Sequence, residues 1–290
     1  MKKIRSRKDD MHFIDMVGLA SDCIGNVTLD GKYALVQIHP TYSIAVEPIS
    51  GVDYPEFEKI VFYANCLAYE HDLPTLISPV KKRALIKPIE KGRNKYINDS
   101  YFDSIGMACE AIKAIRLGPL GLVYFRWSDF TKKVDLEYTN TYSSAAKELS
   151  LYSAAIRQLD PLSEFLGYYR VIESVSGKNH KIWISSNLSK LKSYNFGFLT
   201  FIVDVSDKPM KRRSNLFSIY RKRAVLRTRE LNSKLKGRSI SEYFWHENRC
   251  GIAHGKSNVK EYDFKYNIIE VSRDNYILKL LARIAIEEKI

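Results

Sequence analysis

Residues 242–256 read EYFWHENRCGIAHGK and place two imidazoles, a guanidinium, a carboxylate, an amide and a thiol within nine residues. These groups belong to His246, Glu247, Asn248, Arg249, Cys250 and His254. Such side chains can bind a metal ion, they can transfer protons and stabilise negative charge, or they can simply complete the polar end of a helix. Their spacing and the elements around them must discriminate among these roles.

A zinc site is the first role to test, because the motif HExxH places two histidines one helical turn apart, where both reach one ion. Here Cys250 stands four residues after His246, and His254 follows four residues later. The two histidines would lie about 12 Å apart along an ideal helix. One ion can reach two neighbours in this row but not all three, and the sequence indicates no further ligand. We therefore expect no metal ion and no cofactor.

Arg249 and His254 form an Arg-x4-His pair, which suits metal-independent cleavage of RNA. A histidine can take the proton of a ribose 2′-hydroxyl or supply one to the leaving oxygen. An arginine presents a planar fork of donors that stabilises charge on the phosphorane oxygens. In this hypothesis His254 is the general acid or base, and Asn248 or His246 positions the scissile phosphate.

The spacing of this pair is a weak signal by itself. Arg7 and His12 repeat it in RKDDMH, a charged segment where we expect no packed helices. In an ideal helix, Arg249 and His254 would also point about 140° apart. Joint action on one phosphate would then require a deformed helix near Gly251 or another arrangement around the phosphate.

A purely structural role is the alternative for the same pair. Arg249 could form an ion pair with an acid. Glu173, one position from the apolar stripe of an earlier helix, could face the motif as an orienting acid or belong to a half-buried ion pair. His254, with Gly255 and Lys256, could simply end a helix, where basic groups interact favourably with the free carbonyls and the helix dipole.

Positive charge is concentrated just before this segment. The formal net charge of the chain is +13, and residues 208–238 alone contain twelve Lys or Arg and a single acid, Glu230. A dense basic patch attracts polyanions and releases counterions when phosphates bind, so RNA is the leading partner class. A solvated helix face is the other interpretation. The residues expected to hold the RNA backbone are Lys211, Arg212, Arg213, Arg221, Arg223, Arg227 and Lys256.

The remaining composition indicates a globular protein of the cytoplasm. No apolar run reaches the roughly 20 residues that a membrane-spanning helix needs, so we expect no membrane association. The basic N-terminus lacks the apolar segment of a signal peptide. The four cysteines are far apart and form no CxxC pair, which indicates reduced thiols.

Hydrophobic periodicity divides the chain near residue 140. In residues 1–140, strand-like runs at 27–39, 41–48, 120–127 and 133–138 alternate with helix-like segments at 55–71 and 101–116. Asp30-Gly31 is a tight-turn signal within the first run. This part contains no phosphate-binding loop, and we predict a small α+β domain of sensing or regulatory role.

Residues 141–290 are predicted to form a bundle of four or five helices. Helices are expected at 141–159, from Asp160-Pro161 to Gly177, and at 213–232, 239–254 and 272–288. Asp160 is a suitable N-cap and Gly177 a suitable C-cap. Residues 178–212 are expected to be irregular, with short apolar runs such as FGFLTFIV at 196–203.

This second half resembles the HEPN superfamily, most closely its Apea-like and MauJ-like branches. The resemblance rests on RCGIAHGK, on DPLSEFLGYYRVIESVSG and on the closing amphipathic helix, and it covers roughly residues 141–290. It implies an all-α HEPN-like bundle, an endoribonuclease acting as a toxin or antiviral-defence effector, and a homodimer whose two motifs face one cleft. It also leaves room for a regulatory or antitoxin partner.

A non-catalytic HEPN-like module that binds RNA, nucleotide or protein is the rival. The sequence departs from active members at Cys250, where a polar residue, often asparagine, follows the arginine; here Asn248 precedes it instead. This departure favours the module, whereas the intact Arg249–His254 pair favours the enzyme.

Overall fold

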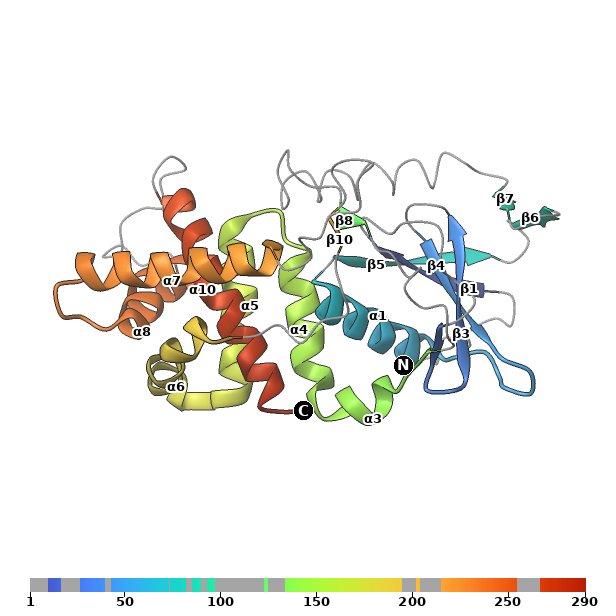
Figure 1. Ribbon diagram of the computed structural model, residues 1–290, viewed down its shortest axis with the longest axis horizontal. Coiled ribbons are helices and arrows are strands. Elements are labelled where there is room, and N and C mark those ends of the chain that lie inside the picture. Colours follow the sequence, from blue (N-terminus) through green and yellow to red (C-terminus); the bar gives the residue numbers. More distant parts are fainter. Residues whose placement is uncertain are drawn as a thin grey trace. The chain divides into compact units, whose positions relative to one another are not determined.

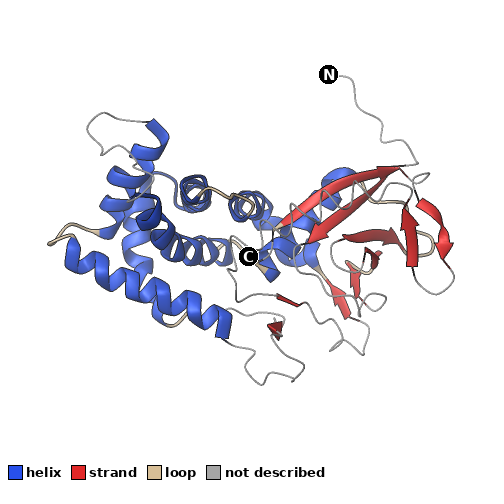
Figure 2. Ribbon diagram, turned by 90° about the horizontal axis from the view of Figure 1, so that it is seen from above, coloured by secondary structure: helices blue, strands red, loops and turns tan. Residues whose placement is uncertain are grey.

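A computed structural model describes much of the chain as two compact units. The first comprises Met1–Ser143 with Phe198–Arg213, and the second Ser144–Gly197 with Ser214–Ile290. The described residues are 10–16, 27–39, 43–72, 74–81, 85–89, 93–96, 123–124, 134–194, 202–203, 215–254 and 267–290. Every described strand belongs to the first unit, and Figure 2 shows these strands in red and the helices in blue. Among the described helices, none has both the length and the apolar character needed to cross a bilayer.

The first unit is built on a sheet of six strands in the order β5-β1-β4-β3-β2-β9. Neighbours pair antiparallel, except for the parallel pair β2 and β9. The strands are β1 (Asp10–Met16), β2 (Val27–Leu29), β3 (Tyr33–His39), β4 (Ser43–Pro48), β5 (Thr75–Lys81) and β9 (Val134–Leu136). Two smaller pairs join β6 (Leu85–Ile89) to β7 (Arg93–Tyr96), and β8 (Val123–Tyr124) to β10 (Ile202–Val203). The α-helices in the described part of this unit are α1 (Phe57–His71) and α3 (Tyr138–Tyr142) (Figure 1).

The turn between β2 and β3 confirms the prediction made from Asp30-Gly31. Both residues have positive φ, 52° at Asp30 and 61° at Gly31, which is the backbone of a type I′ hairpin turn. The Lys32 amide closes the turn by donating to the Leu29 carbonyl at 3.0 Å. Glycine and aspartate tolerate this left-handed region better than most residues do, so local sequence determines the turn.

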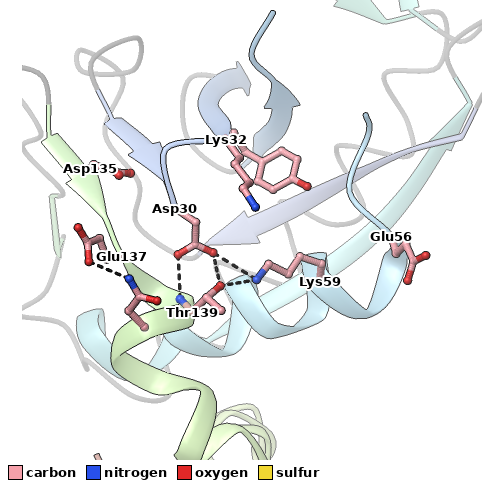
Figure 3. Close-up of a pocket in the computed structure, with 9 residues that line it drawn as sticks. Asp30, Lys32, Glu56, Lys59, Asp135, Glu137 and Thr139 are labelled. Carbon is pink, nitrogen blue, oxygen red and sulfur yellow. Dashed lines mark hydrogen bonds and ion pairs between the residues drawn. The ribbon is translucent and has the colours of Figure 1, made fainter. Parts of the chain in front are cut away.

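The Asp30 carboxylate joins this turn to both helices of the first unit (Figure 3). It accepts hydrogen bonds from the Thr139 amide at 2.8 Å and the Tyr63 hydroxyl at 2.7 Å, and it pairs with Lys59 at 3.2 Å. The Thr139 hydroxyl also donates to it. Burial opposes ionisation of this carboxyl, but the bonds from Thr139, Tyr63 and Lys59 outweigh burial and lower its pKa. Asp30 is therefore the polar centre of the first unit.

A cleft of about 520 Å³ lies beside Asp30 and is lined mainly by charged side chains (Figure 3). Two other acidic residues that line the cleft also accept hydrogen bonds from nearby parts of the chain. Asp135 accepts from the Gly31 amide at 2.8 Å, and Glu137 accepts from the Asn140 side chain at 3.0 Å. We interpret these charged groups as structural, because they connect the turn to β9 and α3.

The second unit is helical throughout its described ranges. Its α-helices are α4 (Ala146–Ile156), α5 (Pro161–Ser176), α6 (His180–Asn187), α7 (Asn215–Lys234), α8 (Ile240–Tyr243), α9 (Cys250–His254) and α10 (Asn267–Glu287). Asp160 caps α5 as predicted, since its carboxylate accepts from the amides of Leu162 and Ser163. Gly167 lets α5 approach α4 closely, because a Cβ atom there would lie 2.6 Å from the Cβ of Ala155. This all-α unit agrees with the fold class predicted for the second half.

The structure can be compared with the sequence predictions for three individual segments. The segment 178–212 was expected to be irregular, and that is wrong for His180–Asn187, which form α6. Within the apolar run 196–203, the described residues Ile202–Val203 form β10 and belong to the first unit. The helix expected at 101–116 lies outside the described residues.

We predict that Asp30→Asn destabilises the first unit. The amide keeps the turn but loses the ion pair with Lys59 and two acceptor interactions, so the free energy of unfolding should fall by about 1–3 kcal/mol. Because ionised Asp30 stabilises the fold, the loss of unfolding free energy relative to wild type should be largest near pH 7. It should become smaller as the pH falls below about 4, where the wild-type carboxyl is protonated. Urea unfolding as a function of pH measures this, with exposed Asp53→Asn as control. An equal loss at pH 3 and pH 7 would contradict it.

Candidate active site

The segment around Arg249 is helical but not uniformly α-helical. Helix α8 begins after Ser239, whose hydroxyl accepts from the Glu242 amide at 3.1 Å. Residues Phe244–Arg249 then form a π-helical turn, and α9 follows. The Cys250 amide donates to the Trp245 carbonyl, five residues earlier, as a π-helix requires. Such turns are rare and often lie at functional sites.

The π-helical turn brings Tyr243 and Asn248 to one acceptor. The Tyr243 hydroxyl and the Asn248 side-chain amide donate to the same oxygen of Asp274, at 3.0 and 2.9 Å. Residues five apart point about 140° away from each other in an ideal α-helix, whereas the wider turn of a π-helix, with its hydrogen bonds between residues five apart, brings them closer to one face. Asp274, on α10 and fully buried, thus fixes the register of the turn that precedes Arg249.

Arg227 donates to the other carboxylate oxygen of Asp274, so the role of Arg227 differs from the one predicted from the sequence. Its Nε lies 2.7 Å from Asp274, and its two terminal nitrogens pair with Glu230 at 3.0 Å and Glu270 at 2.8 Å. The side chain is only 2% exposed. Burial raises the pKa of the Asp274 carboxyl, and the charge of Arg227 opposes that rise. Because three carboxylates surround its guanidinium inside the bundle, we remove Arg227 from the RNA-contacting residues.

Arg249 lies at the surface, between an acid and an aromatic ring. Its guanidinium nitrogen is 3.3 Å from Glu173 of α5, and its Cζ lies 4.7 Å from the centroid of the Trp245 ring. About a quarter of each side chain of the ion pair is exposed, 24% for Arg249 and 25% for Glu173. The guanidinium is therefore oriented by two neighbours and still reachable from solvent.

The rings of His180 and Tyr169 pack near Trp245 from within the bundle. The rings of Trp245 and His180 are 4.6 Å apart, and Tyr169 lies 5.7 Å from His180 and 6.2 Å from Trp245. His180 Nδ1 is 3.1 Å from the Gly177 carbonyl oxygen, so this nitrogen carries the hydrogen. These contacts immobilise the ring on which Arg249 rests.

The other predicted site residues differ in accessibility. Asn248 is buried and donates inward to Asp274, so we no longer assign it to the scissile phosphate. His246 is exposed, and Cys250 is a buried free thiol. His254 is the last residue of α9. The side chain of His254 lies outside the described residues, as do Lys211, Arg212, Arg213 and Lys256.

Helix α7 keeps an exposed basic face beside its buried Arg227. Lys222, Arg223 and Arg229 are exposed, and Arg221 is half-buried and donates to the Tyr194 carbonyl at 3.1 Å. Arg223 also rests on Tyr276, with its Cζ 5.2 Å from the ring centroid. The charge run at 208–238 thus contains both a structural arginine and solvent-facing cations.

Two groups of this site were missed by sequence reasoning. Asp274 follows Val271 and precedes Leu278 at helical spacing, so an acid within the apolar stripe of α10 was the available signal. Tyr169 and His180 had no comparable signal. Among the described residues, no three His, Cys, Asp or Glu side chains are grouped so that they could hold a metal ion.

Comparison with known proteins found one family model that is similar to part of the chain. Residues 149–287 match the family model described as methylamine utilization protein MauJ. The match includes α5, the Arg249 segment and all of α10. No curated protein and no solved structure matches the chain.

We predict that Asp274→Asn strongly destabilises the second unit. The substitution removes the buried charge that faces Arg227, and breaking a buried pair on one side typically costs about 3–5 kcal/mol. Urea unfolding measures the change. The matched control is Lys234→Ala, which breaks partly exposed pairs with Glu230 and Glu270 and should cost about 1 kcal/mol or less. Equal effects of the two substitutions would show that Asp274 does not organise this network.

Proposed function

We propose that the second unit is a HEPN-like domain and that the protein is a metal-independent endoribonuclease. The observation that carries the proposal is the placement of Arg249. Its side chain is about a quarter exposed and is held by Glu173 and Trp245, and Arg249 ends the π-helical turn five residues before His254. A guanidinium held in this way is suited to a phosphate, because its planar fork is already oriented for bidentate contact. The similarity to the MauJ family over residues 149–287 is compatible with this assignment.

The proposed reaction is an internal transesterification of RNA. The ribose 2′-oxygen attacks the adjacent phosphorus, and the bond from phosphorus to the 5′-oxygen breaks. The 2′-hydroxyl loses its proton to a base, and the leaving 5′-oxygen gains one from an acid. His254 would perform one of these transfers, and Arg249 would stabilise the charge on the non-bridging oxygens. The products are a 2′,3′-cyclic phosphate and a 5′-hydroxyl.

The exposed cations of α7 are the proposed contacts for the RNA backbone. Lys222 and Arg229 are seven residues apart and lie on one face of the helix, and exposed Arg223 is adjacent. Lys211, Arg212, Arg213 and Lys256 remain candidates from the sequence. We further propose, from the HEPN resemblance, a cytoplasmic homodimer that acts as a toxin or in antiviral defence. The first unit would regulate its activity.

A non-catalytic RNA-, nucleotide- or protein-binding module is the second candidate. The observation that favours it is the hydrogen bond that Asn248, directly before Arg249, donates to Asp274. The residue directly after Arg249 is the buried Cys250. The amide that could assist the arginine therefore points away from it. RNA binding by the wild type without cleavage would select this candidate.

We predict that Arg249→Ala and His254→Ala each reduce RNA cleavage in the presence of EDTA by about 100-fold or more. Loss of the guanidinium removes charge stabilisation, and loss of the imidazole removes a proton transfer. Purified protein is incubated with total RNA and the products are quantified. Arg238→Ala is the control, because this exposed arginine pairs with Glu247 in the neighbouring segment. Activity that EDTA abolishes would support a metal-dependent enzyme instead.

We also predict that the exposed cations of α7 determine the salt dependence of RNA binding. Replacing Lys222, Arg223 and Arg229 by alanine should weaken binding and reduce the slope of log K against log salt concentration by about one per lost phosphate contact. Titration of a labelled RNA at several salt concentrations measures this. Lys190→Ala, which removes an exposed lysine paired with Glu288, should leave the slope unchanged. An unchanged slope in the triple variant would place the RNA elsewhere.

A further inference from the structure

The hydroxyl of Tyr169 is a buried polar group that the proposed chemistry does not yet use. Tyr169 lies on α5, its side chain is fully buried, and among the described residues its oxygen has no hydrogen-bond partner. Buried hydroxyls are almost always hydrogen-bonded, because leaving one unpaired is unfavourable. An unpaired phenol next to a candidate site therefore requires an explanation.

Tyr169 lies near the Arg249–Glu173 ion pair, because its ring centroid is 6.2 Å from that of Trp245, the ring on which Arg249 rests. Burial raises the pKa of Tyr169, the charge of Glu173 raises it further, and the charge of Arg249 partly opposes both. The phenol thus stays protonated and can only be useful as a donor near neutral pH. Glu173 follows Tyr169 by four residues and lies on the same face of α5. In the same helix, Tyr168 already donates to Glu164, also four residues away, at 2.9 Å.

Arg249 cannot give all of its hydrogen bonds to an RNA phosphate while it remains paired with Glu173. Moving the guanidinium toward the phosphate leaves a half-buried carboxylate without its cation. An unpaired charge in such a position is unfavourable unless another donor replaces the lost partner. Tyr169, four residues before Glu173 on α5, carries a buried hydroxyl that has no partner among the described residues and can donate.

We propose that Tyr169 is a positioning residue that donates its hydrogen bond to Glu173 when an RNA phosphate draws Arg249 away. This inference rests on the proposed function, since it takes Arg249 as the phosphate-binding group. In the absence of RNA, Glu173 holds the guanidinium and the phenol is unpaired. With RNA bound, the phenol stabilises the carboxylate and lowers the energy needed to release Arg249.

The test is a binding experiment that needs no catalysis. Its probe is a fluorescein-labelled 2′-O-methyl oligoribonucleotide, which lacks the attacking hydroxyl and cannot be cleaved. Arg249→Ala should weaken binding, and Tyr169→Phe should weaken it by about three- to tenfold, the effect of one hydrogen bond to a charged group. The melting temperature of Tyr169→Phe should stay the same or rise, because the lost hydroxyl was unpaired. Tyr168→Phe is the matched control: it should melt at a lower temperature and bind the probe normally.

A double substitution separates this role from other roles of the same hydroxyl. In Glu173→Gln the charged acceptor is absent, so adding Tyr169→Phe should change probe binding by less than about twofold. If the effect of Tyr169→Phe persists in Glu173→Gln, or is absent in the wild-type background, the inference is overturned. If Arg249→Ala binds the probe like wild type, the proposed role of Arg249 fails, and the role of Tyr169 fails with it.

Discussion

The buried carboxylate of Asp274 is the interaction on which the helical unit depends. It accepts from Arg227 of α7, from Tyr243 at the end of α8 and from Asn248 within the π-helical turn, so one side chain of α10 joins three helical segments. A charge in this position is stable only while its partners remain, because an unpaired buried ion is strongly unfavourable. The unusual backbone before Arg249 is therefore a consequence of packing around Asp274.

The position of Arg249 follows from that constraint. The π-helical turn ends at Arg249, whose guanidinium then meets Glu173 of α5 and the Trp245 ring. Trp245 is in turn held by contact with His180. The site thus combines a rigid interior, made of Asp274, Arg227 and Asn248, with a reachable arginine at its edge. This separation of structural and accessible cations is what the proposed ribonuclease chemistry requires.

Local sequence signals predicted the elements whose stability is local. Asp30-Gly31 specifies its own turn, and Asp160-Pro161 begins α5, because both depend on residues within a few positions. The π-helical turn could not be predicted in this way, since its cause lies on α10. Arg227 lies in the basic segment 208–238, and the composition of that segment did not distinguish it from the other arginines and lysines. Its helical spacing from Ala224 and Leu231, both buried, was the signal that it faces the core.

The proposed cleavage of RNA by internal transesterification determines the chemistry of the product ends, and those ends are its most direct test. Mass spectrometry of a defined oligoribonucleotide, incubated with the protein in EDTA, identifies those ends. Internal transesterification predicts 2′,3′-cyclic phosphates and 5′-hydroxyls, and no cut where the nucleotide 5′ of the scissile bond is 2′-deoxy. Ends with a 3′-hydroxyl and a 5′-phosphate, or cleavage after a 2′-deoxynucleotide, would contradict it.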